Sequence, residues 1–178
     1  DKIENMKTKS NNNNVIDSKN IINNNMNNEK KPNGGIDNYV NNAGIKNSNI
    51  LDLYSGVGSF GLECISREAN FVRFVEKSPE TVNILKKNLI KLSILDKANV
   101  VSNEIENIKY WNEKEKYNIF FFDPPFQDKN FLEILKIIKK NKIFPNKHIV
   151  IIHRERKSDE NYLNILKVLF IKFYGRSK

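Results

Sequence analysis

Short apolar runs alternate with amphipathic segments from residue 50 onward, whereas the residues before that point show no apolar period. Short apolar runs are typical of buried strands, and apolar residues three or four positions apart are typical of one face of a helix. The alternation predicts an α/β fold, a mainly parallel sheet with helices on both faces. We expect strands at residues 49–53, 71–75, 99–102, 117–122, 148–153 and 168–174.

Two of the intervening segments carry signals for helix starts. Ser78 suits an N-cap and Pro79 suits the first helical position, while Asp128 is expected to cap a second helix. The apolar faces of these two helices are expected to consist of Val82, Leu85, Leu89 and Leu92, and of Phe131, Leu132, Leu135 and Ile138.

Parallel strands joined by helices end at a common edge, and open sheets of this kind bind ligands beyond the carboxyl ends of their strands. Functional residues are therefore expected just after Leu53, Val75, Ser102 and Phe122.

A glycine-rich segment follows the first predicted strand. Asp52 precedes a loop with glycines at positions 56, 58 and 61, and glycine permits the tight turn, the ligand's approach and close helix packing. Dinucleotide enzymes and structural turns also contain this pattern. An Asp before the loop is well placed to meet an ammonium group, which S-adenosylmethionine carries in its amino-acid part and a nicotinamide dinucleotide lacks.

Further candidates for cofactor binding stand at the ends of the second and third strands. Glu76 lies where nucleotide-binding folds place a carboxylate that accepts both ribose hydroxyls. Asn103 is a candidate for the adenine edge, with Glu104 equally near, and Glu63 suits either a surface charge or a site role. The predicted cofactor residues are Asp52, Tyr54, Ser55, Gly56, Gly58, Gly61, Glu76, Lys77 and Asn103.

The fourth strand leads into Asp123, Pro124, Pro125 and Phe126, the predicted catalytic segment. Two prolines hold the acid and the neighbouring carbonyls in a rigid loop. An exocyclic amine donates hydrogen bonds in two directions, to the Asp123 carboxylate and to a carbonyl near Pro124. Phe126 offers a flat face on which a base can stack. The methyl donor is already activated, so the enzyme mainly aligns the reacting atoms, and no metal is expected.

Composition changes this picture in two ways. Of the first 49 residues 17 are Asn, so residues 1–49 form a low-complexity segment that we expect to be disordered, followed by a methyltransferase domain at 50–178. A formal net charge of +9 suits a polyanionic partner, although lysine abundance from coding bias explains it equally well. Cys64 is expected to be a plain buried thiol.

The glycine segment from Leu51 to Arg67, the strand end at Glu76 and the Asp-Pro-Pro-Phe motif together resemble the RsmD-type family. The resemblance implies a Rossmann-like class I fold and S-adenosylmethionine-dependent methylation of guanine N2 in small-subunit (16S) ribosomal RNA. It covers residues 50–178, and the Gly-Leu-Glu-x-x-Ser-Arg extension is fairly specific. The Asp-Pro-Pro-Phe motif also occurs in DNA adenine-N6 enzymes.

The chain departs from the family pattern at three places. We find no Arg-Pro-Thr motif before the glycine loop, and His153-Arg154-Glu155 follows the fifth strand where the family usually has a Glu. The final strand is expected to be incomplete, because the chain stops shortly after Tyr174.

The resemblance implies ribosomal RNA or the small ribosomal subunit as partner, no membrane, and a monomer. Two alternatives stay open: a DNA adenine-N6 methyltransferase, and a non-catalytic RNA-binding or assembly factor on the same fold. The Asn-rich tract suits a nuclear-encoded protein from an AT-rich genome, so we expect an intracellular location, in the cytoplasm or in an organelle such as a mitochondrion or plastid. A phosphate-facing rim is expected from the basic residues Arg67, Arg73, Lys129, Arg154 and Arg156.

Overall fold

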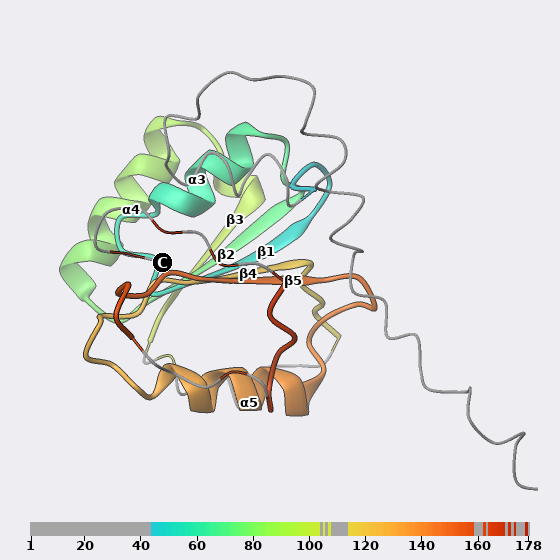
Figure 1. Ribbon diagram of the computed structural model, residues 1–178. Helices are drawn as coiled ribbons and strands as arrows, with labels where there is room; N and C mark the ends of the chain where they lie inside the picture. The colour runs from blue at the N-terminus through green and yellow to red at the C-terminus, as the bar shows by residue number, and fades with distance from the viewer. Residues whose placement is uncertain are drawn as a thin grey trace, which may run out of the picture.

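The computed structural model describes residues 44–103, 105, 107, 114–158, 162, 164–169, 171, 173 and 177. In this part of the chain, helices lie on both faces of one sheet (Figure 1). The segment predicted to be disordered is 1–49, and its residues 1–43 lie outside the described part of the chain. In chain order the elements are β1 (Asn49–Leu53), α3 (Ser59–Ser66), β2 (Phe71–Glu76), α4 (Pro79–Lys91), the 3-10 turn η1 (Leu95–Lys97), β3 (Ala98–Ser102), β4 (Ile119–Phe122), α5 (Phe131–Asn141) and β5 (Ile149–Ile152).

The sheet has the strand order β3-β2-β1-β4-β5, and every neighbouring pair is parallel. At the carboxyl end of β1, Leu53 pairs with Val75 on one side and with Phe122 on the other. The segments that follow β1, β2 and β4 therefore leave the sheet at the same edge. This arrangement confirms the predicted parallel sheet, and it brings the segments expected to carry function to one edge.

The prediction of a strand at residues 168–174 is wrong for the four of these residues that the structure describes. Val168, Leu169, Ile171 and Phe173 belong to no strand, and residues 170, 172 and 174 lie outside the described part. Val168, Ile171 and Phe173 are exposed. The segment is a short apolar run, which is typical of a strand, but a strand also needs a neighbouring strand with which its backbone forms hydrogen bonds.

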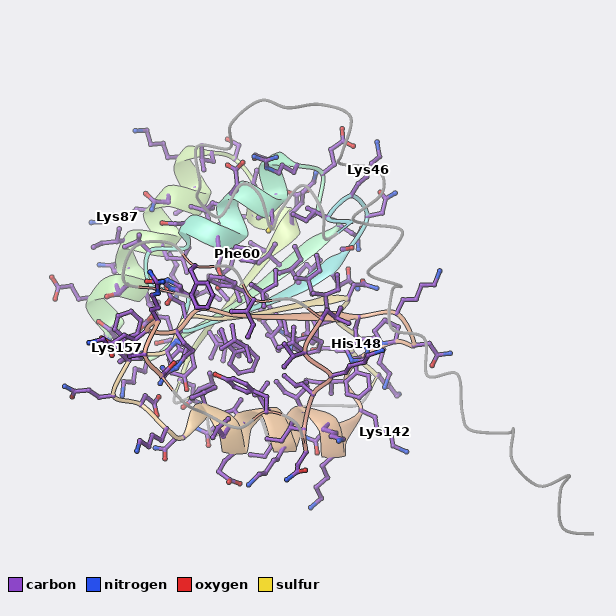
Figure 2. The ribbon with its side chains drawn as sticks, viewed as in Figure 1. Lys46, Phe60, Lys87, Lys142, His148 and Lys157 are labelled. Carbon is purple, nitrogen blue, oxygen red and sulfur yellow. The ribbon has the colours of Figure 1, made fainter. Side chains whose placement is uncertain are left out.

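Each face of the sheet has its own apolar core. Helices α3 and α4 lie on one face of the sheet (Figure 1). The apolar cluster on that face includes Phe60, Phe74 and Leu85. Phe60, labelled in Figure 2, stacks on Phe121 of β4 with ring centroids 3.9 Å apart. On the other face α5 packs through Phe131 and its neighbours. Ile45 belongs to the first cluster, so folded structure begins before Ile50.

The two predicted helix starts have different outcomes. The Ser78 side chain accepts a hydrogen bond from the Thr81 amide, which confirms the N-cap. Asp128 is not the N-cap of α5; Asn130 holds that position, and Asp128 Oδ1 accepts the Asn130 amide at 2.7 Å.

The predicted apolar faces are largely confirmed. Leu92 is the exception: it is 54% exposed because α4 ends at Lys91 and the helical period does not continue. Leu132 is partly buried against the core. The buried residues of the two helices are Val82, Leu85 and Leu89 in α4 and Phe131, Ile134, Leu135 and Ile138 in α5.

Gly61 is where α3 approaches the sheet most closely. A Cβ atom at this position would lie 2.2 Å from Cε1 of the buried Phe74 ring. We expect Gly61→Ala to lower the free energy of unfolding by about 3 kcal/mol, because the ring has no room to move. Denaturant titration measures the loss.

Gly44 provides the matched control for this substitution. It lies outside any helix with a positive φ of 68°, and an added Cβ meets nothing within 4 Å. Gly44→Ala is expected to cost only backbone strain, about 1 kcal/mol. Equal losses in the two variants would contradict the close packing of α3 on Phe74.

Candidate active site

A cavity of about 440 Å³ lies at the carboxyl edge of the sheet. It lies where the sequence places function, because the segments after β1, β2, β3 and β4 all contribute to its wall. All four residues of the predicted catalytic segment line it, together with several of the predicted cofactor residues. The lining residues are Tyr54, Val75, Glu76, Lys77, Asn103, Ile105, Asp123, Pro124, Pro125, Phe126 and Asp128.

The glycine segment forms a tight turn between β1 and α3. Gly56 and Gly58 have φ values of 55° and 90°, the left-handed region that glycine enters without strain. The Gly58 amide donates to the Ser55 carbonyl at 2.8 Å, and the Gly56 amide donates to Glu76 Oε2 at 2.9 Å. The turn is thereby fixed to the end of β2.

Asp52 is buried beneath this turn, with 1% of its surface exposed. Its Oδ2 accepts the Gly61 amide at 3.0 Å, whereas Oδ1 is buried and accepts no hydrogen bond from the described residues. Burial raises the pKa of Asp52 to about 8; the Gly61 hydrogen bond opposes the rise, and the nearby carboxylates of Asp123 and Glu76 add to it. A buried carboxylate with an unmet acceptor suits a cationic ligand group, as predicted for the ammonium.

This pKa predicts how stability depends on pH. The folded-state value of about 8 exceeds the ordinary value of 3.8, so the folded protein binds the proton more tightly than the unfolded chain. The stabilisation from Asp52 is complete below about pH 4 and is lost as the pH rises through about 8. We expect Asp52→Asn, which keeps an acceptor for the Gly61 amide, to flatten the fall in Tm between about pH 5 and 8.

Asp96→Asn is the control for this measurement, because Asp96 is exposed in η1. It should leave the pH profile of Tm unchanged. Parallel profiles for the parent protein and Asp52→Asn would show that Asp52 is not a buried titrating group.

Glu76 is oriented by two backbone donors. Its Oε2 accepts the Gly56 amide, and its Oε1 accepts the Ser78 amide at 2.8 Å. Each carboxylate oxygen has a second lone pair, so the side chain retains acceptor capacity toward the cavity that it lines. Asn103 lies beside it, because the Asn103 amide donates to the Glu76 carbonyl at 3.2 Å. This geometry suits the predicted binding of ribose hydroxyls.

The remaining predicted cofactor residues do not line the cavity: Asp52, Ser55, Gly56, Gly58 and Gly61. Gly61 packs α3 against β2, and Ser55 donates its amide to the Val75 carbonyl at 3.0 Å. The Ser55 hydroxyl is buried without a hydrogen-bond partner in the described part of the chain. Direct contact of these residues with a cofactor stays a prediction.

The predicted catalytic segment contacts the end of β5. Asp123 Oδ1 lies 2.8 Å from His153 Nδ1, and both side chains are about half exposed. The Phe126 ring is 45% exposed and meets the His153 ring edge-on, with centroids 6.1 Å apart. Pro124 is buried and also lines the cavity. Asp123 and Phe126 thus present a carboxylate and an aromatic face to the same cavity.

The prediction that Arg154 belongs to the phosphate-facing rim is wrong, because its side chain is buried. Only 2% of its surface is exposed, and its guanidinium donates to the Pro125 carbonyl at 3.0 Å and the Phe126 carbonyl at 2.8 Å. It cannot face RNA from this position. Arginine is rarely buried, which favours a surface position, and the loop carbonyls that accept its hydrogen bonds lie 28 to 30 residues away in the sequence.

The other rim residues differ in their surroundings. Arg67 pairs with Glu63 at 2.6 Å, so Glu63 takes part in a helix-surface pair. Arg73 pairs with Glu115. Lys129 and Arg156 are exposed, and their role toward RNA phosphates stays a prediction.

The remaining findings concern the single cysteine, metal-binding groups and membrane-spanning helices. Cys64 is buried, as predicted, and burial raises the pKa of its thiol. The described residues contain no group of three His, Cys, Asp or Glu side chains arranged to hold a metal ion. Within the same part of the chain, no helix is both long and apolar enough to span a bilayer.

Solved structures share this fold. A candidate methylase from Haemophilus influenzae aligns over 75% of this chain and 84% of its own, with a TM-score of 0.68 and 25% identity. A candidate methyltransferase from Escherichia coli aligns over 75% and 73%, with a TM-score of 0.65 and 25% identity. The protein therefore has the Rossmann-like class I fold of the S-adenosylmethionine-dependent methyltransferases.

Sequence comparison identifies the family. The family model described as Conserved hypothetical protein 95 matches residues 33–178, and the chain belongs to this family, the RsmD-type family expected from its motifs. A relative from Buchnera aphidicola subsp. Baizongia pistaciae, named Ribosomal RNA small subunit methyltransferase D, is 35% identical over 66% of this chain and 59% of its own length. The chain thus spans about three fifths of the length of this curated relative.

Proposed function

We propose that this protein transfers a methyl group from S-adenosylmethionine to the exocyclic N2 of a guanine in small-subunit ribosomal RNA. One observation carries the proposal: Glu76, at the end of β2, and the segment Asp123–Phe126, after β4, line a single cavity. A cofactor bound by Glu76 would therefore lie beside a base bound by Asp123–Phe126. The names of the relatives, which refer to ribosomal RNA of the small subunit, support RNA as the substrate.

The residues on the β1 and β2 side suit the cofactor. Asp52 Oδ1 is a buried acceptor that has no partner among the described residues and suits the ammonium group. The fixed carboxylate of Glu76 suits two ribose hydroxyls. Asn103 lines the cavity next to Glu76 and suits the adenine edge. When bound, S-adenosylmethionine supplies a methyl group already activated by its sulfonium.

The residues after β4 suit the target base. One oxygen of Asp123 contacts His153, which leaves the other to accept one hydrogen of the amine. A backbone carbonyl near Pro124 is the acceptor proposed for the second hydrogen. The Pro124 carbonyl qualifies, because its contact with Arg154 is long, at 3.5 Å, and a carbonyl oxygen has a second lone pair. Held in this way, the amine turns its lone pair toward the methyl group, while Phe126 stacks on the ring. The alkylated nitrogen is acidic and releases its proton readily, so Asp123 serves chiefly to position the amine.

The experiment that tests this function is transfer of labelled methyl from S-adenosylmethionine to small-subunit RNA, supplied naked and as subunit particles. Nucleoside analysis of the product should yield N2-methylguanosine. Transfer to duplex DNA supplied in parallel, with N6-methyladenine as the product and no label in the RNA, would favour the alternative target instead. Calorimetry without any heat of S-adenosylmethionine binding, while RNA still binds, would favour a non-catalytic scaffold. The location of the protein in the cytoplasm or an organelle stays a prediction.

A further inference from the structure

We propose that Arg154 is a positioning residue for the base-binding loop, residues Asp123 to Phe126. Its buried guanidinium holds the loop carbonyls from behind, so that Asp123 and Phe126 face the cavity. The expected change in kcat rests on the proposed function, whereas the contact between Arg154 and the loop does not.

The guanidinium contacts three consecutive carbonyls of the loop. Nη1 donates to the Pro125 carbonyl at 3.0 Å and reaches the Pro124 carbonyl at 3.5 Å, while Nη2 donates to the Phe126 carbonyl at 2.8 Å. The side chain is among the largest fully buried ones, at 2% exposure. Arginine is suited to such a place, because its planar group offers several donors in a fixed arrangement.

The loop needs donors from elsewhere, because neither proline carries an N–H group. Only a few backbone bonds within the described residues fix its course. Asp123 donates its amide to the Leu53 carbonyl at 3.4 Å, and the Asp128 amide donates to the Pro125 carbonyl at 2.8 Å. Arg154 adds a second donor to the Pro125 carbonyl and is the donor to the Phe126 carbonyl, so it fixes the direction of the backbone from Pro125 to Phe126.

Arg154 is itself held in place by the first residue of α5. Its guanidinium carbon lies 4.6 Å from the centroid of the Phe131 ring, and Phe131 is fully buried. A cation over an aromatic face is favourable, most of all where water is excluded. The loop, the end of β5 and the start of α5 are therefore joined through one side chain.

The residue before Arg154 contacts the opposite side of the loop. His153 reaches the Asp123 carboxylate and the Phe126 ring edge, both of which line the cavity. Consecutive residues in an extended chain point in opposite directions. The end of β5 therefore contacts the loop on both sides, through His153 next to the cavity and through Arg154 beneath it.

The test compares Arg154→Gln and Arg154→Lys with Arg156→Gln. Arg156 is a matched control, because it is exposed two residues further on and lies over Phe173. The first measurement is hydrogen–deuterium exchange of the amides of Phe126, Gln127 and Asp128, which needs neither cofactor nor RNA. Exchange should accelerate in both Arg154 variants and stay at the parent rate in Arg156→Gln.

The second measurement separates positioning from general loss of structure. We expect kcat for methyl transfer to fall about 100-fold in Arg154→Gln, since small displacements of the reacting groups cost this much. The Kd of S-adenosylmethionine should stay within about threefold of the parent value, because Glu76 and Asp52 do not contact the loop carbonyls. Arg154→Lys keeps the charge over Phe131 but not the paired donors, so it stays folded and recovers only part of kcat.

Parent-like exchange in folded Arg154→Lys and Arg154→Gln would overturn the inference. So would a loss of cofactor affinity in proportion to the loss of kcat, which would mark a general structural defect. If the parent protein transfers no methyl group, the proposed function fails, yet the exchange measurement still decides whether Arg154 holds the loop.

Discussion

Asp123→Ala is expected to reduce methyl transfer at least about 1,000-fold, the largest effect of any single substitution in the site. The Asp123 carboxylate lines the cavity and has one oxygen directed to His153. Removing it takes away the acceptor proposed to hold the amine. It also removes the partner of His153, so the ring is no longer fixed beside Phe126. Labelled-methyl transfer under single-turnover conditions measures the loss.

The cofactor should bind nearly as well to this variant, because the predicted cofactor carboxylates belong to other strands. Calorimetry with S-adenosylmethionine checks this point, and Asp96→Ala serves as an exposed control in η1. Near-normal turnover by Asp123→Ala would disprove the proposed role of this carboxylate in holding the amine.

Glu76→Ala is expected to weaken cofactor binding about 100-fold, as suits the loss of two hydrogen bonds to a charged group. The substitution acts in two ways. It removes the carboxylate proposed to accept the ribose hydroxyls. It also leaves the amides of Gly56 and Ser78 without their acceptor, so the glycine turn is no longer fixed to β2. Calorimetry with S-adenosylmethionine and S-adenosylhomocysteine measures the change.

Glu80→Ala is the control, because Glu80 is exposed in the first turn of α4. Its cofactor affinity should match that of the parent. An unchanged Kd in Glu76→Ala would place the cofactor somewhere other than the end of β2. A Tm measured for each variant separates lost binding from lost folding.

The strands and the place of the site could be predicted from local signals. Strands β1 to β5 are short apolar runs between segments of helical period, and this alternation located them. The glycine segment and the Asp-Pro-Pro-Phe motif each contain residues with special backbone needs. Because both follow neighbouring parallel strands, their meeting in one cavity followed from the topology.

Features that depend on contacts distant in sequence could not be predicted. Arg154 is buried because loop carbonyls 28 to 30 residues away accept its hydrogen bonds, which no local pattern records. The contact of His153 with Asp123 needs β5 to lie beside β4. Leu92 fitted the helical period but lies beyond the last residue of α4. Residues 168–174 were assigned to a strand from composition alone.

The structure of this protein bound to S-adenosylhomocysteine tests the central claim most directly. We expect the ribose hydroxyls on Glu76 and the amino-acid part toward Asp52, with the sulfur atom facing the segment Asp123–Phe126 across the shared cavity. A ligand bound elsewhere, or one whose sulfur is separated from Asp123 by protein, would contradict the account.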